Sequence, residues 1–416
     1  MGSSHVEDKP DSFPDLKQNE AIRQANDDAA THQQFNAWQQ PGPAAFDFRS
    51  DTMTTPTASM LAAITNTTLL DDVVLEDPTT NNLESYIADI SGHEAALLVM
   101  SGTMGNQVAL RTHLTQPPHS VLCDIRGHVY NYEAGGVSSL SNAMIIPVRP
   151  SNSHHLTLED IQAHAIISSD VHACPTRVIS LENTLDGMIM PLSEIKRIAT
   201  FAREHGLKLH LDGARIWEAV AATDGSSLPD FCSHFDSVSM CFSKGLGAPI
   251  GSIIVGSKAF IAHARRIRKM IGGGTRQAGV ISAAARVAVE EGFGRGPSGE
   301  GGKLRACHIK ARRVAEMWES KGGKLAKPTE TNMVWLDVSR EGVSNAEFVQ
   351  FAANEGLKAF SGRLVVHYQI TDEAVERLGR VMDAVLKKGR ENGPSNGEVG
   401  GNTNGERYGS KRQRIG

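Results

Sequence analysis

The strongest constraint on the fold is a repeated change from short apolar runs to longer amphipathic stretches, which extends from Pro56 to about Lys388. The short runs are rich in β-branched residues and predict strands, and the stretches between them have the spacing of helices. Strands that are apolar on both faces and separated by helices are typical of a mostly parallel sheet covered on both sides. We therefore predict an α/β fold built on one large sheet. The predicted strands are Ala95–Val99, Ser120–Cys123, Ala143–Val148, Thr176–Leu181, Leu207–Leu211, Ser237–Phe242 and Ser252–Val255, and the helices between them include Asn106–Leu114, Leu158–His164 and Leu192–His205.

A second, smaller α/β unit is predicted after a glycine-rich junction at Glu291–Gly302. Its elements are helix Lys303–Ser320, strand Met333–Val338, helix Ala346–Asn354, strand Leu364–Tyr368 and helix Glu373–Leu386. The two ends of the chain are polar and predict disorder. The expected organisation is an N-terminal extension at 1–44, a large domain at 45–295, a small C-terminal domain at 296–388 and a tail at 389–416.

Charge, apolar runs and cysteines exclude several classes of protein. The 42 Lys and Arg residues against 47 Asp and Glu residues give a net charge of −5 at pH 7, whereas a nucleic-acid-binding domain normally carries a basic surface. The longest apolar run, near Ala95–Met100, is far shorter than the ~20 residues of a membrane span. The five cysteines are odd in number and form no C-x-x-C pair, which favours a reduced, cytoplasmic compartment. We expect no nucleic acid and no membrane as partner.

Two groups among the 40 glycines are informative. Fourteen lie in the junction and in the C-terminal tail and are interpreted as flexible chain. Twelve others lie in or beside the motifs that follow the predicted strands, where glycine allows the backbone to approach a ligand closely.

Three motifs follow predicted strands and point to one site. Ser101–Asn106 opens a helix directly after a strand, so that free N–H groups and the positive end of the helix favour an anion such as a phosphate. Asp212 ends another strand, where ligands bind in open parallel sheets. Lys244 leaves a third strand next to Gly245 and Gly247, and a desolvated lysine is suited to Schiff-base chemistry.

Each of these motifs also has a plain structural interpretation. The first is then an ordinary strand-to-helix turn, Asp212 caps the next helix, and Lys244 is an exposed loop residue. The plain interpretation of Lys244 is disfavoured because the three motifs occur in order along one sheet edge. A phosphate site, a carboxylate for a ring nitrogen and a Schiff-base lysine together favour pyridoxal phosphate as cofactor.

From about Phe48 to Lys388 the chain resembles the threonine aldolases. This group is beta-eliminating lyase-like and belongs to the fold-type-I pyridoxal-phosphate enzymes. The motifs occur in the order of that family. They are Arg49–Thr52, Asp71-Asp72 with Glu76–Thr79, Ser101–Asn106, His128 with Tyr132-Glu133, Glu182–Thr184, Asp212–Arg215, Ser243–Gly247, Gly272–Gly274 with Arg276-Gln277, and Arg363 with His367. The resemblance implies a transferase-like large domain, a small C-terminal domain and a homotetramer, a dimer of dimers with its sites at the dimer interface.

The resemblance also implies a role for each matching residue. Lys244 is expected to bind the cofactor covalently, Asp212 to hold the pyridine nitrogen, and Gly102 and Thr103 to hold the phosphate. His128 is expected to stack on the ring, and His172 to contact the substrate hydroxyl. The remaining expected residues are Ser50, Arg215 and Arg363 for the substrate carboxylate, with Arg215 also near the cofactor, and Lys269 and Arg276 toward the cofactor of a neighbouring subunit. No metal is expected.

The implied activity is carbon–carbon cleavage of L-threonine, L-allo-threonine or a related β-hydroxy-α-amino acid to glycine and an aldehyde. His128, His172 or a water molecule they orient is the expected base. One position departs from the family: a His usually follows Glu182-Asn183-Thr184, and Leu185 stands here. Leu185 either packs passively or changes how the β-hydroxyl is handled. The alternatives are an alanine racemase of the same cofactor type, with Lys244 and either Tyr132 or His128 on opposite faces of the ring, and a non-catalytic binding protein that kept the fold.

Overall fold

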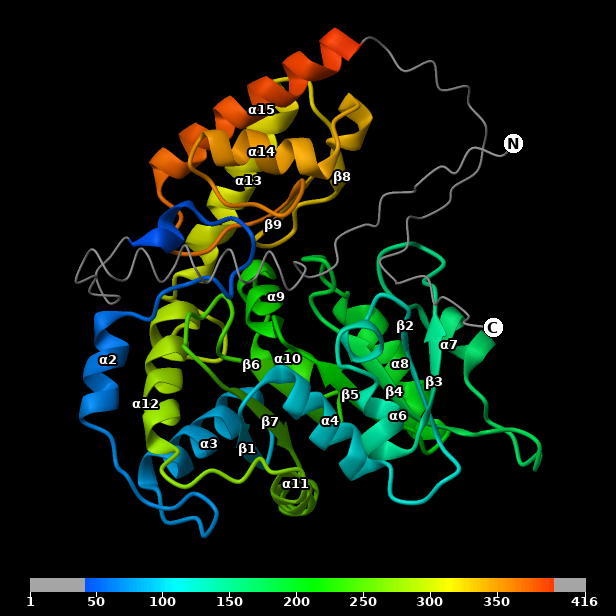
Figure 1. Cartoon of the computed structure of the whole chain (residues 1–416). Coiled ribbons are helices and arrows are strands. Elements are labelled where there is room, and N and C mark those ends of the chain that lie inside the picture. The colour runs from blue at the N-terminus through cyan, green and yellow to red at the C-terminus, as the bar shows by residue number, and fades with distance from the viewer. Residues whose placement is uncertain (1–41, 393–416) are drawn as a thin grey trace, which may run out of the picture. The chain divides into compact units, whose positions relative to one another are not determined.

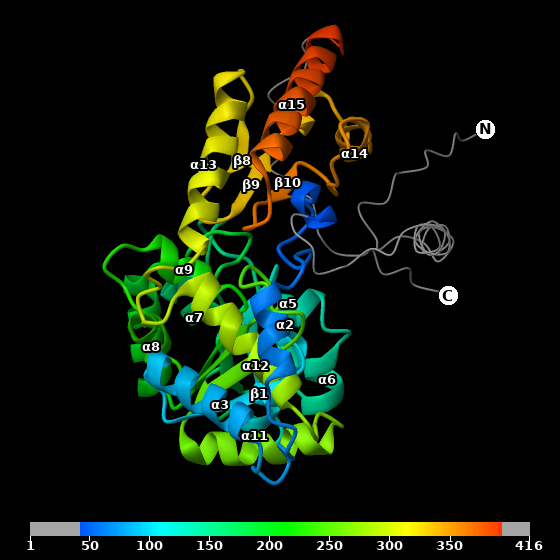
Figure 2. The ribbon, with the colours of Figure 1, turned by 90° about the vertical axis from the view of Figure 1, so that its left-hand side faces the viewer.

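The computed structural model describes residues 42–392, which belong to one compact unit (Figures 1 and 2). The predicted disorder of the chain ends falls mostly on residues 1–41 and 393–416, outside the described part. No helix within residues 42–392 is long and apolar enough to cross a membrane.

In the described part of the chain, the larger sheet has seven strands in the order β1-β7-β6-β5-β4-β2-β3. β7 pairs antiparallel with its neighbours β1 and β6, and the remaining pairs are parallel. Six strands therefore end at the same edge of the sheet, which we call the carboxyl edge. The predicted strands are confirmed to within one residue at each end. They are β1 Ala95–Val99, β2 Ser120–Asp124, β3 Met144–Val148, β4 Thr176–Glu182, β5 Lys208–Asp212, β6 Ser237–Cys241 and β7 Ser252–Gly256.

Helices cover both faces of this sheet, and alternate side chains of its strands pack into different apolar clusters. Leu97 and Val99 of β1 pack with α4 and α11, whereas Ala96 and Leu98 face the main core. The first face carries α4 Gly102–His113, α6 Gly136–Ser141 and α11 Lys258–Met270, and the main core includes α3 Pro78–Ser91, α8 Leu192–Glu204, α9 Ile216–Ala222 and α12 Gly279–Ala288. The remaining α-helices of this part are α2 Ala58–Thr65, α5 His128–Asn131, α7 Leu158–His164 and α10 Leu228–Cys232.

The C-terminal part has its own sheet and core, as predicted. Strands β8 Leu325–Lys327, β9 Met333–Leu336 and β10 Arg363–Val365 form an antiparallel sheet in the order β10-β9-β8. Helices α13 Leu304–Ser320, α14 Asn345–Asn354 and α15 Asp372–Asn392 share its core (Figure 1). Two short helices, η1 Pro43–Phe46 and η3 Ser339–Glu341, also belong to this part.

The structure shifts three of the predicted boundaries. Phe48 is fully buried in the core of the C-terminal part, so residues near 48 contribute to the small unit rather than to the large one. η1 (Pro43–Phe46) begins inside the extension predicted to be disordered. α15 continues to Asn392, past the predicted start of the tail at 389, because its apolar stripe keeps it packed on α14 and η3.

The glycine-rich junction is compact, which corrects its interpretation as flexible chain. A π-helical turn, η2 (Val289–Phe293), leads into it, and Gly294 and Gly301 form an antiparallel bridge. Both bridge residues have positive φ, 126° and 78°, a conformation that glycine adopts without steric cost. These glycines therefore build a tight turn between the two parts.

Candidate active site

The carboxyl edge of the large sheet gathers the predicted site residues from several strands. Glu182 ends β4 and Asp212 ends β5, next to each other in register. Lys244 follows β6, and Gly102 follows β1 at the start of α4. The topology therefore brings together residues that lie more than a hundred positions apart in the sequence.

Asp212 is buried in a network of hydrogen bonds. Its Oδ2 accepts from Nδ2 of Asn106 at 2.7 Å, and the same amide nitrogen donates to Oε1 of Glu133 at 2.8 Å. Oδ1 of Asp212 accepts from the backbone N–H of Ala214 at 3.1 Å. Atoms of His128, Glu133 and Asp212 lie within 4.8 Å of one another, and Asn106 already donates to both carboxylates. These hydrogen bonds account for the cluster.

His128 is oriented by its neighbours at the start of α5. Its Nδ1 lies 2.8 Å from Oε1 of Glu133, and its backbone N–H donates to Oε2 of Glu182 at 2.8 Å. An ionised Glu133 can only accept, so Nδ1 of His128 carries the proton in this contact. A neutral imidazole then has its free lone pair on Nε2.

The start of α4 fits an anion. Oγ of Ser101 accepts from the N–H of Met104, and the Ser101 carbonyl accepts from Gly105. The N–H groups of Gly102 and Thr103 belong to the first helical turn, where no intrahelical partner exists. A Cβ at Gly102 would lie 2.8 Å from Sγ of Cys241, so only glycine lets the helix start this close to β6. The residues present fit the phosphate cradle predicted from the sequence.

Lys244 lies in a turn enclosed from two directions. A Cβ at Gly245 would collide with Oε1 of Glu218, and a Cβ at Gly247 would lie 2.5 Å from the hydroxyl of Tyr368, which belongs to the C-terminal part. Burial, and next the charge of Asp212, raise the pKa of Glu182 well above its ordinary value, and the charge of Lys244 opposes this shift. The charge of Lys244 therefore acts on the carboxyl group of Glu182 at the end of β4.

Arg215 is engaged more fully than the sequence indicates. Its Nε and Nη2 donate to the two oxygens of Asp51 at 2.8 and 2.6 Å. Burial raises the pKa of Asp51, but the charge and hydrogen bonds of Arg215, together with the charges of Lys244 and Arg363, hold that pKa well below its ordinary value. Ser50, beside Asp51, has its Oγ 3.4 Å from that carboxylate. The guanidinium of Arg215, which is predicted to bind the substrate carboxylate, is therefore already paired with the ionised Asp51.

Arg363 approaches the same region from β10 of the C-terminal part. Its Nη1 donates to the carbonyl of Arg49 at 3.3 Å, and its guanidinium lies 5.7 Å from the ring centroid of Trp335. Its charge contributes to the lowered pKa of Asp51. The structure thus brings Ser50, Arg215 and Arg363 to one place, around Asp51.

His172 is not brought to this site, which corrects its predicted contact with the substrate hydroxyl. It lies in the loop before β4, at the opposite edge of the sheet from Asp212. Its side chain is 90% exposed, and its Nδ1 lies 2.9 Å from Oδ1 of Asp170. The loop between α7 and β4 has its own local hydrogen bonds, which hold His172 away from the carboxyl edge.

Lys269 and Arg276, which are expected to reach a neighbouring subunit, are both exposed in the single chain. Lys269 is exposed at the end of α11. Arg276 is 69% exposed and donates to Oδ2 of Asp71 at 2.6 Å.

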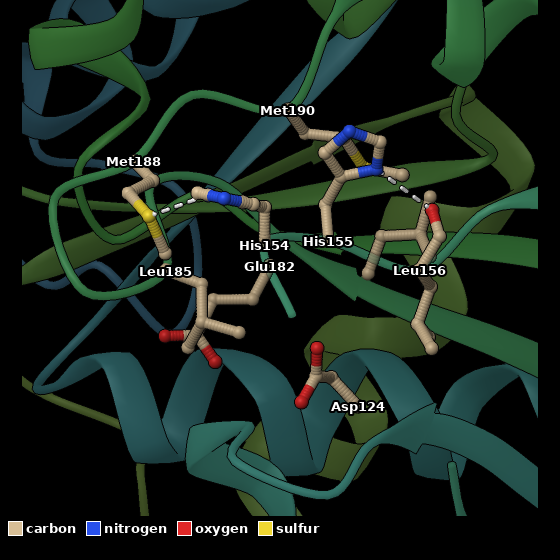
Figure 3. A pocket seen from close by; sticks show the side chains of 9 residues that line it. Asp124, His154, His155, Leu156, Glu182, Leu185, Met188 and Met190 are labelled. Atoms are coloured by element: carbon tan, nitrogen blue, oxygen red, sulfur yellow. Dashed lines mark hydrogen bonds between the residues drawn. The ribbon is translucent and has the colours of Figure 1, made fainter. Parts of the chain in front are cut away.

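Leu185 lies beside Glu182 in a small pocket of about 10 Å³, too small to hold more than one water molecule (Figure 3). Nδ1 of His154 lies 3.1 Å from the sulfur of Met188 at its rim. Leu185 is buried. Its packing in this pocket favours the passive interpretation of the departure from the family.

Sequence reasoning assigned no role to Asn106, Glu133, Glu182 or Asp51, which support the predicted residues. All four lie within the motifs that carry the family resemblance. The signal was therefore present in their position. The partners of Asn106, Glu182 and Asp51 are distant in sequence, and a single sequence does not reveal them.

Comparison with known proteins assigns this arrangement to a family. The beta-eliminating lyase family matches residues 47–341. The chain is 55% identical to the aldolase vrtJ of Penicillium aethiopicum, over 85% of this chain and 89% of that protein. It is 47% identical to the alanine racemase TOXG of Cochliobolus carbonum, over 84% and 90%, and 45% identical to a low-specificity L-threonine aldolase of Eremothecium gossypii, over 85% and 92%.

The fold is shared with solved structures. A putative L-allo-threonine aldolase from Listeria monocytogenes superposes with a TM-score of 0.65 at 22% identity, covering 85% of this chain and 98% of that one. The expected fold, with a large mostly parallel sheet and a small C-terminal part, is confirmed.

Proposed function

The chain belongs to the beta-eliminating lyase family, and from this membership we propose that it is a pyridoxal-phosphate-dependent carbon–carbon lyase. Its proposed reaction is the cleavage of L-threonine, L-allo-threonine or a related β-hydroxy-α-amino acid to glycine and an aldehyde. The observation that carries the proposal is the cluster of His128, Glu133, Asn106 and Asp212 at the same sheet edge as Lys244. Relatives 45% and 55% identical that are named aldolases support it.

The cofactor site is proposed from the residues at the carboxyl edge. Lys244 would hold pyridoxal phosphate covalently, Asp212 would accept a hydrogen bond from its ring nitrogen, and Gly102 and Thr103 would donate to its phosphate. When bound, the cofactor supplies an electron-withdrawing ring that stabilises negative charge at the substrate Cα. His128 would stack on the ring, Arg215 would stand near the bound group, and Lys269 and Arg276 would reach the site of a neighbouring subunit.

Substrate orientation is assigned to the residues around Asp51. A guanidinium binds a carboxylate through paired hydrogen bonds, and Arg363 would supply this contact with Ser50 beside it. Arg215, fixed by Asp51, would present its remaining N–H to the same carboxylate. This contact would hold the Cα–Cβ bond in the orientation that selects it for cleavage.

Proton transfer is assigned to His128. Because Nδ1 of His128 keeps its proton and donates it in the hydrogen bond to Glu133, the lone pair on Nε2 is available to accept the proton of the substrate β-hydroxyl, directly or through a water molecule. The predicted alternative base, His172, lies at the other edge of the sheet. His128 therefore carries this step in our proposal.

A racemase acting on alanine is the second candidate, and two observations favour it. The alanine racemase TOXG is 47% identical to the chain. Tyr132 lies beside His128, with ring centroids 5.6 Å apart, and is half exposed. A racemase would use Lys244 and one of these two side chains on opposite faces of the ring to exchange the Cα proton.

We also propose assembly into a homotetramer and a cytoplasmic location. The segment before α3 exposes Leu69, Leu70, Val74 and Leu75, and Arg276 pairs with Asp71 in the same segment. An exposed apolar patch of this kind is typical of a subunit interface.

The cofactor assignment is tested by borohydride reduction of the holoenzyme followed by peptide mapping. Lys244 should carry the reduced cofactor, and Lys244→Ala should lose the visible absorption band and lower the threonine cleavage rate by about 10³-fold or more. Lys258→Ala, at an exposed lysine that begins α11, is the matched control and should keep both. A Lys244→Ala enzyme that retains substantial cleavage would remove the assignment.

A further inference from the structure

A line of hydrogen bonds runs from Asp212 across the molecule to the far end of α4. Oδ1 of Asn106 lies 3.1 Å from Nε2 of His210 in the middle of β5, and Nδ1 of His210 lies 2.8 Å from Oγ of Ser237 at the start of β6. The same hydroxyl lies 2.8 Å from Nε2 of His113, the last residue of α4. Helix α4 thus carries both Asn106 and His113, and β5 and β6 carry the residues between them.

The direction of every proton in this line follows from its two carboxylates. Asp212 and Glu133 both accept from Nδ2 of Asn106, so its Oδ1 must face His210 and accept. A neutral His210 then carries its proton on Nε2 and accepts at Nδ1 from the hydroxyl of Ser237. That hydroxyl in turn accepts from Nε2 of His113. All donors therefore point toward Asp212.

Burial keeps the line neutral. His210 is fully buried, and burial lowers its pKa to about 4. Burial, and next the neighbouring His210, lower the pKa of His113 to about 3. A positive charge on His210 would turn its Nδ1 into a donor and reverse its contact with the hydroxyl of Ser237, and at neutral pH this ring carries no such charge.

The amide of Asn106 cannot pass a proton from one of its atoms to the other, so the line does not deliver protons to Asp212. Instead, it fixes and polarises the Asn106 amide as a donor to Asp212, because hydrogen bonds in a chain strengthen one another in a low-dielectric interior. We propose that His210 is a positioning residue, which acts through Asn106 to hold the Asp212 carboxylate ionised and aimed at the cofactor ring nitrogen. This inference rests on the proposed function.

The sign of the effect follows from the chemistry of the pair. A donor aimed at Oδ2 stabilises the carboxylate and makes it a weaker base. The proton shared between Asp212 and the ring nitrogen then stays on the nitrogen. If the Asn106 amide is no longer held and polarised as a donor, Asp212 becomes more basic, and that proton moves toward the carboxylate.

The test compares two variants of His210. His210→Phe removes the group that donates to Oδ1 of Asn106, and His210→Gln has an amide that can still donate to it. His119→Phe is the matched control, since His119 is buried in the same part of the molecule and bonds to the carbonyl of Ser141 instead. Two quantities are measured: the dissociation constant of pyridoxal phosphate from the apoenzyme, and the ¹⁵N chemical shift of the labelled ring nitrogen in the holoenzyme.

His210→Phe should weaken cofactor binding by about 3- to 10-fold and move the ¹⁵N signal toward that of neutral pyridine. His210→Gln should restore both to near the original values, and His119→Phe should leave both unchanged. If His210→Phe does not fold, Ser237→Ala, which removes the hydroxyl bonded to Nδ1, should move both quantities in the same direction.

An unchanged ¹⁵N signal in His210→Phe, or in Ser237→Ala where that variant is used, would overturn the inference. Equal effects of the Phe and Gln variants, or an equal effect of His119→Phe, would also overturn it. Asp212→Ala separates this failure from a failure of the proposed function. If Asp212→Ala changes both quantities and His210→Phe changes neither, only the positioning role is lost, whereas an inert Asp212→Ala contradicts the cofactor site itself.

Discussion

The two arginines predicted to bind the substrate carboxylate have different surroundings. Arg215 forms a buried bidentate pair with Asp51, whereas Arg363 contacts a backbone carbonyl and lies near the Trp335 ring. Removing one partner of a buried ion pair leaves an uncompensated charge, so a change at Arg215 would confuse binding with stability. A change at Arg363 tests the clamp and leaves the bidentate pair of Arg215 and Asp51 in place.

Arg363→Ala should raise the KM for threonine by about 10- to 100-fold, the range expected for a charge-assisted hydrogen bond. The effect on kcat should be smaller. Steady-state kinetics measure both, and Arg340→Ala, at an exposed arginine in η3, provides the control. An unchanged KM in Arg363→Ala would count against the clamp.

At the residue scale, the sequence predicted the groups expected to touch the cofactor and not the groups that hold them. Asp212 and Lys244 could be singled out because Asp212 ends one apolar strand and Lys244 lies shortly after another. Asp51 could not be singled out, since its partner Arg215 is 164 positions away and no local sequence pattern predicts this ion pair. His172 failed for the opposite reason: it matches a family position in sequence, but its loop lies at the other edge of the sheet.

At the scale of elements, the strands were predictable because runs such as Ala95–Val99 are buried on both faces. Helix α11 (Lys258–Met270) was not among the predicted elements, although Ile261, Ala264 and Ile267 form an apolar stripe along it. The glycine-rich junction was misinterpreted because glycine permits both loose chain and tight turns. The bridge between Gly294 and Gly301 shows that here it makes a turn.

The contact between α4, β5 and β6 predicts a dependence of stability on pH. His210 has a pKa of about 4 in the folded protein and about 6.5 when unfolded. Between these values the unfolded chain binds a proton that the folded chain does not, so stability falls as the pH is lowered. The loss from His210 between pH 7 and pH 5 is about 2 kcal/mol.

Urea unfolding at pH 7 and pH 5 measures this loss as a difference in the free energy of unfolding. His210→Gln removes one titrating group and should reduce the difference. A variant that keeps the full pH dependence would show that other groups cause it.

At the scale of the whole molecule, the sequence predicted two parts, and the structure joins them more closely than a linker would. Helix α13 begins in the main core with Leu304 and continues in the C-terminal core with Cys307. Tyr368 packs against Gly247 beside Lys244. These contacts could not be predicted, because an apolar stripe on a helix does not show which of two cores it enters.

The proposed assembly predicts a solution mass of four times the 44.7 kDa chain. Light scattering on the active enzyme measures it directly. If Lys269 and Arg276 reach a neighbouring site, Lys269→Ala should lower activity without lowering the thermal midpoint. A strictly monomeric enzyme with full activity would contradict this assignment.

The most direct test of the account is to incubate the purified holoenzyme separately with L-threonine and with L-alanine and to identify the products. We predict glycine and acetaldehyde in equal amounts from L-threonine, because His128 is placed to take the β-hydroxyl proton. Formation of D-alanine from L-alanine, with no cleavage of L-threonine, would contradict the proposed aldolase and establish the racemase instead.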